Sequence, residues 1–233
     1  SGLTFDISKL KCQMSSLTPV MGSLARIPLT WQHPPFWYEH LYQNIPILPE
    51  SNCVDTQAFE SAVHMKRIVG ILLHRAFKYL AENPALIKTP DLCDRFNKRW
   101  SAQLRTLCVA QSQMNTALML LNKGLSQTIK DERGLWILTA QEQSQCEYAL
   151  HSYANNINKT IIIDRTFVAN NERWIIDYKT SLPIGDHEDF LTQDVPTHAA
   201  QLHYYAQVMQ KIDNRPIRLG LYYPLISAWR ELI

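Results

Sequence analysis

The first sustained pattern of apolar positions lies between residues 56 and 81. Apolar side chains recur there at steps of three and four residues: Val63, Ile68, Ile71, Leu72, Ala76 and Leu80. This spacing predicts one buried face of an α-helix. Asn83-Pro84 ends the helix, because the residue before a proline disfavours helical backbone. Two further helices are predicted over 90–108 and 110–130, the first with Asp91 near its start, where negative charge suits the helix dipole.

Shorter apolar runs replace the helical spacing in the second half of the chain. Two short strands are predicted near 135–138 and 147–151, followed by a β-hairpin and a polar loop at 186–195. A helix is expected over 197–212, with Ala199, Leu202, Tyr205 and Met209 on one stripe, and a last strand over 217–223. This order of helices and strands predicts an α/β core with a helical insertion.

The hairpin carries the most informative polar residues. Two β-branched apolar runs flank Asn170-Asn171, which is typical of a two-residue turn. With that turn Asp164 faces Asp177, and Lys179 shares the face of Asp177 because side chains alternate along a strand. Cross-strand Cβ atoms lie ~5 Å apart, and two carboxylates that close repel unless something positive lies between them. Mg²⁺ accepts one or two carboxylates together with phosphate oxygens, so the hairpin predicts a metal-dependent phosphodiesterase.

Residues 1–58 differ from the rest because they lack sustained periodicity. Proline and aromatic residues gather there: Trp31, Pro34, Pro35, Phe36, Trp37 and Tyr38. Disordered tails are poor in aromatics, so we expect an irregular arm that packs on another surface. The chain begins Ser1-Gly2 without a methionine, which indicates a piece of a longer polypeptide. We therefore expect an N-terminal arm over 1–58 and one domain over 59–233, with a helical insertion at about 84–133.

Composition narrows the class of protein. Hydrophobic residues make up 46% of the 233, as in ordinary globular proteins, and no apolar run reaches the ~18 residues of a membrane span. The five cysteines are dispersed without a C-x-x-C pair, which favours reduced thiols over disulfides, zinc or an iron–sulfur cluster. A net charge of +2 is weak for a protein that finds nucleic acid by its own field. A basic cluster of Arg95, Lys98, Arg99 and Arg105 is by default a solvated helix face.

Four further residues carry candidate chemistry, each with a simpler interpretation. His74 lies on the first helix, four residues after Gly70, where a lone histidine is more often structural than a ligand. Glu147 begins a predicted strand and taken alone is a surface glutamate. Gln201 and Tyr205 are four residues apart on the late helix and therefore share one face.

These residues in their order resemble a known family. G-x-x-x-H ending at His74, then Glu147, then Ile163-Asp164-Arg165, then Asp177-Tyr178-Lys179, then Gln201-x-x-x-Tyr205, is similar to the RecB-type nucleases of the PD-(D/E)XK superfamily. The resemblance covers 58–232, and the insertion at 84–134 matches poorly. The family often has glycine two residues before the first aspartate, where this chain has Ile162. The resemblance implies a restriction endonuclease-like α/β fold, with a mixed sheet flanked by helices.

The resemblance also implies a biological setting. Such domains form the C-terminal end of helicase-nucleases similar to the exodeoxyribonuclease V beta subunit or AddA, exonucleases of double-strand-break repair and recombination. The implied partners are DNA and the helicase domain of the same polypeptide. A further subunit of the RecC or AddB kind is compatible with the resemblance, and no membrane is expected as a partner. The implied compartment is the bacterial cytoplasm.

The roles implied by the resemblance follow the motif positions. His74, Asp164, Asp177 and the main-chain carbonyl of Tyr178 would bind Mg²⁺ or Mn²⁺, and the imidazole would favour Mn²⁺. A metal-bound water would attack the phosphate, oriented by Lys179, which also stabilises the developing charge. The remaining residues would act around this centre, Glu147 as an accessory group near the metal, and Gln201, Tyr205 and Arg165 as supports for the active-site strand or the DNA backbone.

Three other interpretations compete with this one. A nuclease fold that has lost activity could serve as a DNA-binding or protein-docking module. A stand-alone nuclease of the CRISPR-associated RecB-like type would usually carry clustered cysteines for an iron–sulfur centre, and this sequence has no such cluster. A purely structural α/β domain would leave Asp164 and Asp177 as surface charges, but both lie in apolar runs, where a charge is costly unless paired or bound to metal.

Overall fold

The computed structural model describes residues 56–154, 157–183 and 185–232. The predicted N-terminal arm at 1–58 lies almost entirely outside the described residues. The helices are α3 (Thr56–Glu82), α4 (Leu92–Thr106), α5 (Met114–Thr128), α6 (Glu132–Leu138) and α7 (His187–Met209), with short 3-10 turns η1 (Pro84–Lys88) and η2 (Gln111–Gln113). The strands are β1 (Glu142–Ala154), β2 (Ile157–Ala169), β3 (Glu172–Tyr178), β4 (Ile217–Tyr223) and β5 (Ala228–Leu232). This composition confirms the predicted α/β class with a mixed sheet flanked by helices.

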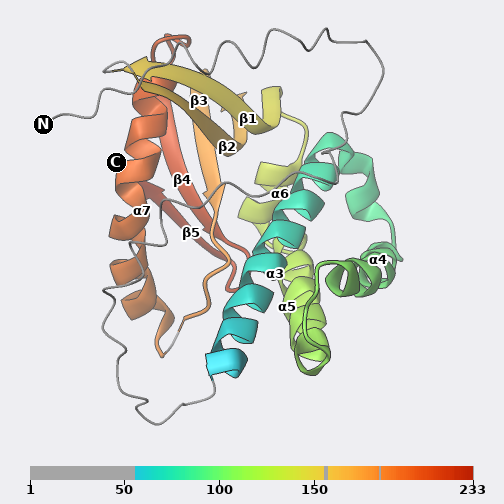
Figure 1. Ribbon diagram of the computed structural model, residues 1–233. Helices are drawn as coiled ribbons and strands as arrows, with labels where there is room; N and C mark the ends of the chain where they lie inside the picture. The colour runs from blue at the N-terminus through green and yellow to red at the C-terminus, as the bar shows by residue number, and fades with distance from the viewer. Residues whose placement is uncertain (1–55, 155–156, 184, 233) are drawn as a thin grey trace, which may run out of the picture. The chain divides into compact units, whose positions relative to one another are not determined.

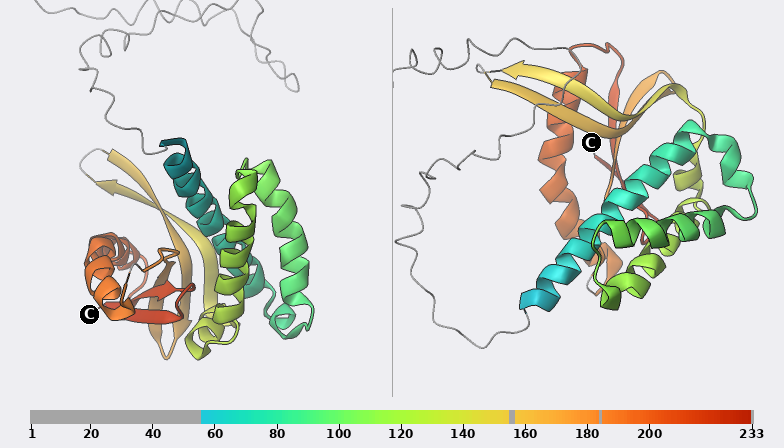
Figure 2. Two further views of the ribbon diagram at one scale, coloured as in Figure 1. Left: turned by 90° about the horizontal axis from the view of Figure 1, so that it is seen from below. Right: turned by 45° about the vertical axis from the view of Figure 1, so that its right-hand side comes forward.

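The five strands form one sheet in the order β1-β2-β3-β4-β5. All neighbours are antiparallel except β3 and β4, which are parallel and are connected through α7. Helix α7 covers one face of the sheet, and α3, α5 and α6 lie on the other (Figures 1 and 2). Helix α4 packs farther out, against α5. The sheet is therefore the middle of three layers.

Helix α3 is the longest element and forms the main contact on its side of the sheet. Leu72, Leu73, Phe77 and Leu80 are each at most 1% exposed, and burying a side chain of this kind contributes roughly 1.5–3 kcal/mol. The predicted helix over 56–81 is thus confirmed, but its predicted stripe is partly wrong. Val63 and Ile71 are exposed, because the buried face is formed by Leu73 and Phe77 beside Leu72 and Leu80.

Two predictions of local structure are wrong. The expected strand near 135–138 is helix α6, which begins after Asp131, whose side chain accepts a hydrogen bond from the Gly134 amide as a helix cap. The expected loop at 186–195 is the first part of α7, which begins after the capping residue Asp186 and continues through Pro196. Sequence reasoning stopped at the proline, although the helix has a full set of start signals before it.

The hairpin has the predicted turn and register. Asn170 and Asn171 both have positive φ, 54° and 61°, as a two-residue type I′ turn requires. Every β2–β3 pair from Ala169–Glu172 to Arg165–Ile176 keeps the predicted offset. The ladder ends at that last pair, one position before Asp164 and Asp177 would meet. Both carboxylates consequently lie where the two strands begin to separate.

Near Asp164, the side chains of β2 at alternate positions pass from one face of the sheet to the other. Phe167 belongs to the core on the side of α3, whereas Ile161 and Ile163 belong to the core under α7. Strand β1 has a residue with positive φ here, Glu147 at 48°, which lies between the paired positions Cys146–Arg165 and Tyr148–Ile163 on either side of Asp164. The β1–β2 ribbon is therefore strongly twisted at Asp164, and beyond the twist it extends past the end of β3 (Figure 2).

None of the helices among the described residues is long and apolar enough to cross a membrane. The three cysteines within the described residues, Cys93, Cys108 and Cys146, are free thiols.

Candidate active site

Three elements bring the predicted catalytic residues together at the carboxyl end of β3. Helix α3 supplies His74, the twisted part of β2 supplies Asp164, and β3 supplies Asp177 with Lys179 immediately after it. Their side chains range from 9% exposed for Asp177 to 30% for His74. The site is thus sheltered but reachable from solvent.

Asp164 is fixed by the backbone of the neighbouring strand. Its Oδ2 atom accepts a hydrogen bond of 2.9 Å from the amide of Tyr178. That amide lies beyond the last β2–β3 pair, so a side chain replaces the ladder partner that the separating strands no longer provide. The end of the ladder therefore orients this carboxylate.

His74 reaches the same position from the helical layer. Its Nδ1 lies 3.3 Å from Asp164 Oδ1, and its Nε2 lies 3.2 Å from the carbonyl oxygen of Tyr178. Burial alone would lower the pKa of His74, but the hydrogen bond and charge of Asp164, together with the charge of Asp177, raise it above its usual value. The imidazole therefore lies in a strongly negative environment.

Asp177 is the more buried of the two carboxylates in this site, with 9% of its side chain exposed against 18% for Asp164. Burial, followed by the charge of Asp164, raises its pKa to about 6 despite the opposing charges of Lys179 and His74. Lys179 Nζ forms an ion pair with Asp177 Oδ2 over 2.7 Å, and within the described part of the chain this buried oxygen has no further polar partner. A carboxylate held in this way is unusually ready to accept a cation.

The glycine of the G-x-x-x-H motif explains how close α3 comes. A Cβ atom added at Gly70 would stand 3.0 Å from the Thr180 hydroxyl, one residue beyond Lys179. A side chain at this position would require the Thr180 side chain or the helix to shift by a few tenths of an ångström. Gly70 thus allows a close approach of α3 one turn before His74.

Residues 38–228 match the family model described as the PD-(D/E)XK nuclease superfamily. The chain belongs to this superfamily. Comparison with curated proteins found no match. The match confirms the superfamily that the motifs predicted, and members of the superfamily are usually metal-dependent nucleases that use Mg²⁺ or Mn²⁺. The RecB type and the helicase-nuclease parent stay predictions.

The donor set fits the metal that this superfamily uses. Two carboxylates, an imidazole and the carbonyl of Tyr178 converge, which are ligands that Mg²⁺ and Mn²⁺ accept. Among the residues that the structure describes, no three His, Cys, Asp or Glu side chains are already placed to hold an ion. His74 and Lys179 instead neutralise the carboxylates. The chemistry of the donors fits a divalent cation that would take over this role.

Two motif residues on α7 bond to each other. Gln201 Nε2 donates to Tyr205 Oη over 2.5 Å, and the Tyr205 ring is buried in the core under α7. The expectation that this spacing shares one helix face is therefore met. Arg165, a predicted support residue, is 1% exposed and donates to the carbonyl oxygens of Ile137 and Thr139 at the end of α6. It can hold the fold together but offers no surface to DNA.

Glu147 is directed away from the carboxylate cluster. Its Oε2 lies 2.6 Å from Lys78 Nζ, one helical turn after His74 on α3. The side chains of both residues are more than a third exposed. The structure therefore places Glu147 beside the site, on an exposed lysine rather than on the other motif residues.

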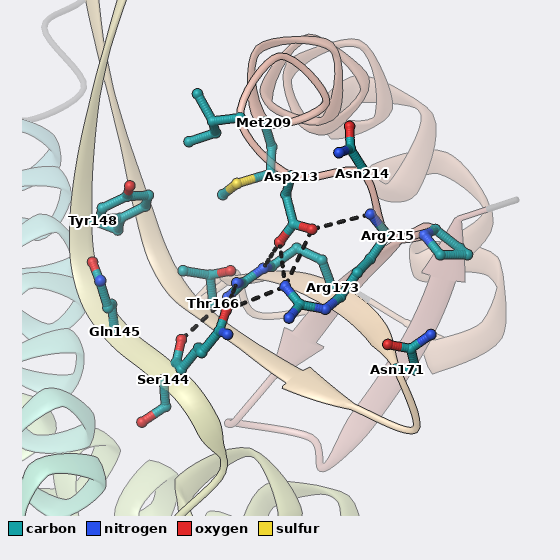
Figure 3. Close-up of a pocket in the computed structure, with 13 residues that line it drawn as sticks. Ser144, Gln145, Tyr148, Thr166, Asn171, Arg173, Met209, Asp213, Asn214 and Arg215 are labelled. Carbon is teal, nitrogen blue, oxygen red and sulfur yellow. Dashed lines mark hydrogen bonds and ion pairs between the residues drawn. The ribbon is translucent and has the colours of Figure 1, made fainter.

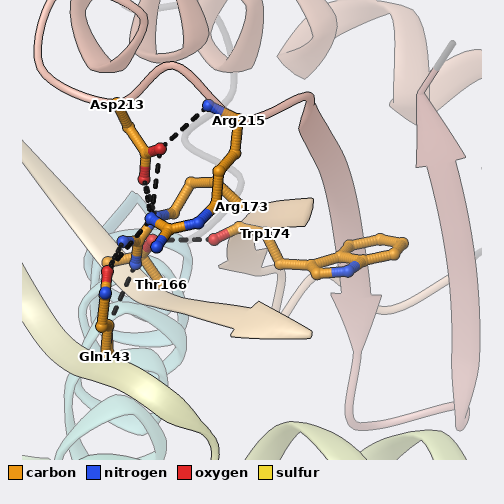
Figure 4. A network of polar contacts seen from close by, with 6 residues as sticks. All are labelled: Gln143, Thr166, Arg173, Trp174, Asp213 and Arg215. Atoms are coloured by element: carbon orange, nitrogen blue, oxygen red, sulfur yellow. Dashed lines mark hydrogen bonds and ion pairs between the residues drawn. The ribbon is translucent and has the colours of Figure 1, made fainter. Parts of the chain in front are cut away.

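A wide cavity lies at the other end of β3. A hollow of about 850 Å³ opens at the turn end of the β2–β3 hairpin, beside the end of α7 (Figure 3). Arg173 forms its floor, donating to Asp213 at 2.7 Å and to the carbonyl and side-chain oxygens of Gln143 at 3.1 and 2.7 Å (Figure 4). Arg215 contacts the same Asp213 and Gln143 oxygens. This network fastens β1, β3 and the segment after α7, away from the catalytic end of β3.

Sequence reasoning missed a group of residues beside Lys179. Asp194 Oδ2 accepts a hydrogen bond of 2.8 Å from Tyr223 and lies 3.2 Å from His198 Nε2. Burial, and then the charge of Lys179, lowers the pKa of His198. The four-residue spacing of Asp194 and His198 was the available signal, but it has meaning only on a helix, and 186–195 was expected to be a loop.

Proposed function

We propose that this protein is a Mg²⁺- or Mn²⁺-dependent deoxyribonuclease that hydrolyses phosphodiester bonds. The observation that carries the proposal is the convergence of Asp177, a buried carboxylate with a raised pKa, with Asp164, His74 and Lys179. Two carboxylates and an imidazole gathered at one sheltered point are typical of a cation site, and a perturbed pKa supports a functional role.

Asp164, Asp177, His74 and the carbonyl oxygen of Tyr178 would hold the cation. When bound, the ion supplies positive charge that polarises the phosphodiester and lowers the pKa of the attacking water. The amide of Tyr178 holds Asp164 in place by a bond that needs no ion. The ligand geometry is therefore prepared by the strand itself.

Lys179 would orient the attacking water and stabilise the charge that develops on the phosphate. Its main-chain amide donates to the Tyr222 carbonyl over 2.9 Å, which continues the β3–β4 pairing past the end of β3. The side chain thus starts from a fixed backbone position. With Asp177 engaged in holding a cation, Nζ of Lys179 would be available to substrate.

Gln201 and Tyr205 would support the site from α7. Their mutual hydrogen bond fixes the exposed amide of Gln201 on a buried ring. We assign to Gln201 a contact with the DNA backbone and to Tyr205 the positioning of that amide. Glu147 would act at the edge of the site, where it holds Lys78.

The finer assignment is a C-terminal exonuclease domain of a bacterial, cytoplasmic helicase-nuclease that acts in double-strand-break repair and recombination. The motif order from His74 to Tyr205 and the superfamily match support it. In that setting the helicase part of the polypeptide, with or without a RecC- or AddB-like subunit, would deliver the strand. The weak net charge of +2 agrees with a domain that depends on delivery.

The test is cleavage of end-labelled single-stranded DNA by the 233-residue chain with Mg²⁺ or Mn²⁺. Metal-dependent products that disappear in Lys179→Ala, while that variant still binds Mn²⁺ in calorimetry, would establish the nuclease and the role of the lysine. Products that show stepwise removal of nucleotides from one end of the DNA would support exonuclease action. Cleavage that survives both Lys179→Ala and Asp177→Asn would contradict the assigned site.

A catalytically silent DNA-binding or docking module is the second candidate. It is favoured by one observation, that His74 and Lys179 already neutralise the carboxylates while no three ligating side chains of the described residues are poised around an ion. Wild-type protein that binds no Mn²⁺ by calorimetry at millimolar concentration would decide for this module.

A further inference from the structure

A groove between α3, α4 and the edge strand β1 opens beside the catalytic carboxylates. Its main part has a volume of about 470 Å³ and is lined among others by Arg75, Lys78, Tyr79, Arg99, Trp100 and Glu147. A smaller hollow of about 170 Å³ shares Tyr79, Phe96 and Arg99 with it and adds Arg95. Because these two hollows share three lining residues, we call them together the α3–α4 groove.

The groove lies close to the carboxylate cluster. Lys78, which lines the groove, is one helical turn beyond His74 on α3. Glu147, which also lines it, binds Lys78 and stands between the β1–β2 pairs on either side of Asp164. A strand that runs from the carboxylate cluster past Lys78 would therefore enter this groove.

Positive charge prevails in the groove. Four cationic side chains line it against two carboxylates, those of Glu82 and Glu147. Arg75, Arg95 and Arg99 are exposed and form no ion pair with any other residue that the structure describes. These guanidinium groups contribute nothing visible to the fold and are free to bind phosphate.

The groove also offers an aromatic surface. Tyr79 is 40% exposed although its ring packs edge-on against Phe96 at 6.2 Å, and Phe96 in turn lies 5.1 Å from Trp100. An exposed ring held by its neighbours is a platform on which an unpaired base can stack. Paired bases present no open face, so this surface suits single strands.

We propose that the α3–α4 groove is a binding site for single-stranded nucleic acid. Phosphates bind to Arg75, Arg95 and Arg99, and one base stacks on Tyr79. The proposal rests on the proposed function, because its ligand is the strand that the nuclease cuts. It assigns to the helical insertion the task of holding that strand next to the scissile phosphate.

The test measures binding apart from catalysis. Anisotropy of a fluorescent oligothymidylate is recorded with the 233-residue chain in EDTA, for the wild type and for Arg95→Glu/Arg99→Glu. We expect Kd to rise at least about tenfold and the slope of log K against log salt to fall by about 1.4, since each single-strand phosphate contact contributes about 0.7. Tyr79→Leu should raise Kd by about five- to hundredfold while leaving the salt slope unchanged.

The matched control is Lys98→Glu/Arg105→Glu. It reverses the same number of charges on the same helix, at exposed positions outside the groove. We expect it to change Kd less than about threefold. An equal loss of affinity in the two double variants would mean that only the overall charge of the protein attracts the oligonucleotide, and this would overturn the proposal. A wild type that does not bind the oligonucleotide would overturn it as well. Circular dichroism melting confirms that each variant is folded.

A small substrate separates this proposal from the proposed function. Bis-(p-nitrophenyl) phosphate with Mn²⁺ reaches the carboxylates without filling the groove. Arg95→Glu/Arg99→Glu should hydrolyse it at the wild-type rate and cut the oligonucleotide more slowly. Wild-type protein that binds the oligonucleotide through the groove but hydrolyses neither substrate would refute the nuclease and leave the binding site standing.

Discussion

Strand β3 carries a buried charge at each end, and the two are treated in opposite ways. At the turn end, Arg173 donates from three nitrogens to Asp213 and Gln143. At the other end, four residues or about 13 Å along the strand, Asp177 has a buried oxygen that, among the described residues, pairs with Lys179 alone. The pKa values differ accordingly, since Asp213 has a lowered pKa and that of Asp177 is raised to about 6.

This difference separates a structural ion pair from a functional site. Burial works against both carboxylates, but in Asp213 the hydrogen bonds of Arg173 and the Arg215 amide outweigh it. In Asp177 the second carboxylate, Asp164, adds to burial, and the nearby cations do not compensate. A buried carboxylate whose pKa stays raised beside its cationic partners is a candidate for a functional role. The size of a cavity does not reveal this difference, because a cavity of about 850 Å³ surrounds the satisfied pair of Arg173 and Asp213.

The largest effect is expected from Asp177→Asn on cleavage. The substitution keeps the shape and removes the charge that attracts the cation, so the initial rate with Mn²⁺ should fall by roughly 10³-fold or more. Asp213→Asn, the equivalent change at the other end of β3, should keep wild-type cleavage under conditions where it is folded. An equal loss of cleavage rate in the two variants would contradict the distinction between a functional carboxylate at one end of β3 and a structural one at the other.

Arg173→Leu should have the largest effect on stability. It leaves Asp213 buried with fewer positive partners, and breaking a buried pair in this way costs about 3–5 kcal/mol of unfolding free energy. Urea denaturation followed by tryptophan fluorescence measures this cost. The double variant Arg173→Leu/Asp213→Asn should recover part of it, and a single variant as stable as the wild type would show that the network is not structural.

The two ends should respond oppositely to pH in metal-free buffer. The raised pKa of Asp177 means that the folded state binds a proton more tightly than the unfolded state, so stability falls as the pH rises from 4 through about 6. A shift from 3.8 to about 6 corresponds to about 3 kcal/mol at most. Asp213, with its lowered pKa, stabilises above its unfolded pKa, and this contribution is lost below pH 4 as the pH falls through its folded pKa.

Asp177→Asn isolates the first of these contributions. Urea unfolding at pH 5 and pH 7.5 should give a wild type that is less stable at the higher pH. The raised pKa of His74 acts in the same direction, since its contribution is lost as the pH rises. The variant should therefore keep only a smaller difference, and an unchanged difference would mean that Asp177 titrates normally.

The smallest effect is expected at the exposed pair of Lys78 and Glu147. Both side chains are more than a third exposed, so solvent screens their attraction, and Glu147→Gln should cost less than about 1 kcal/mol of stability. Thermal melting of the variant tests this. A large loss of cleavage without a loss of stability would mean that Glu147 contacts the reaction, although its carboxylate binds Lys78 in the free protein.

The sequence predicted the hairpin correctly, because the same short segment determines both its turn and the positions of its carboxylates. The Asn170-Asn171 turn determines the register of the hairpin, and the register brings Asp164 close to Asp177. Sequence reasoning could not foresee the end of the ladder at Arg165–Ile176, because that end depends on the twist of the whole β1–β2 ribbon. The bond from the Tyr178 amide to Asp164 is a consequence of this separation.

Long-range partners were likewise beyond reach from sequence. Arg165 was expected near DNA or in a supporting role, and only the position of α6 shows that its guanidinium binds carbonyl oxygens inside the protein. Arg173, Asp213 and Gln143 are far apart in the chain and carry no motif. Helix α7 was begun ten residues too late because Pro196 interrupts its pattern, and Asp194 was missed with it.

Tyr178 contributes to the candidate site through main-chain atoms that every residue except proline also carries. Its amide holds Asp164 and its carbonyl faces His74, while its ring packs on Phe77 in the core. Evolution can therefore vary this side chain for packing without touching the chemistry. A share of the proposed site is in this sense inherited with the fold rather than encoded at a position. A mutational scan would record Tyr178 as a core residue and would overlook the role that we propose for its main-chain atoms.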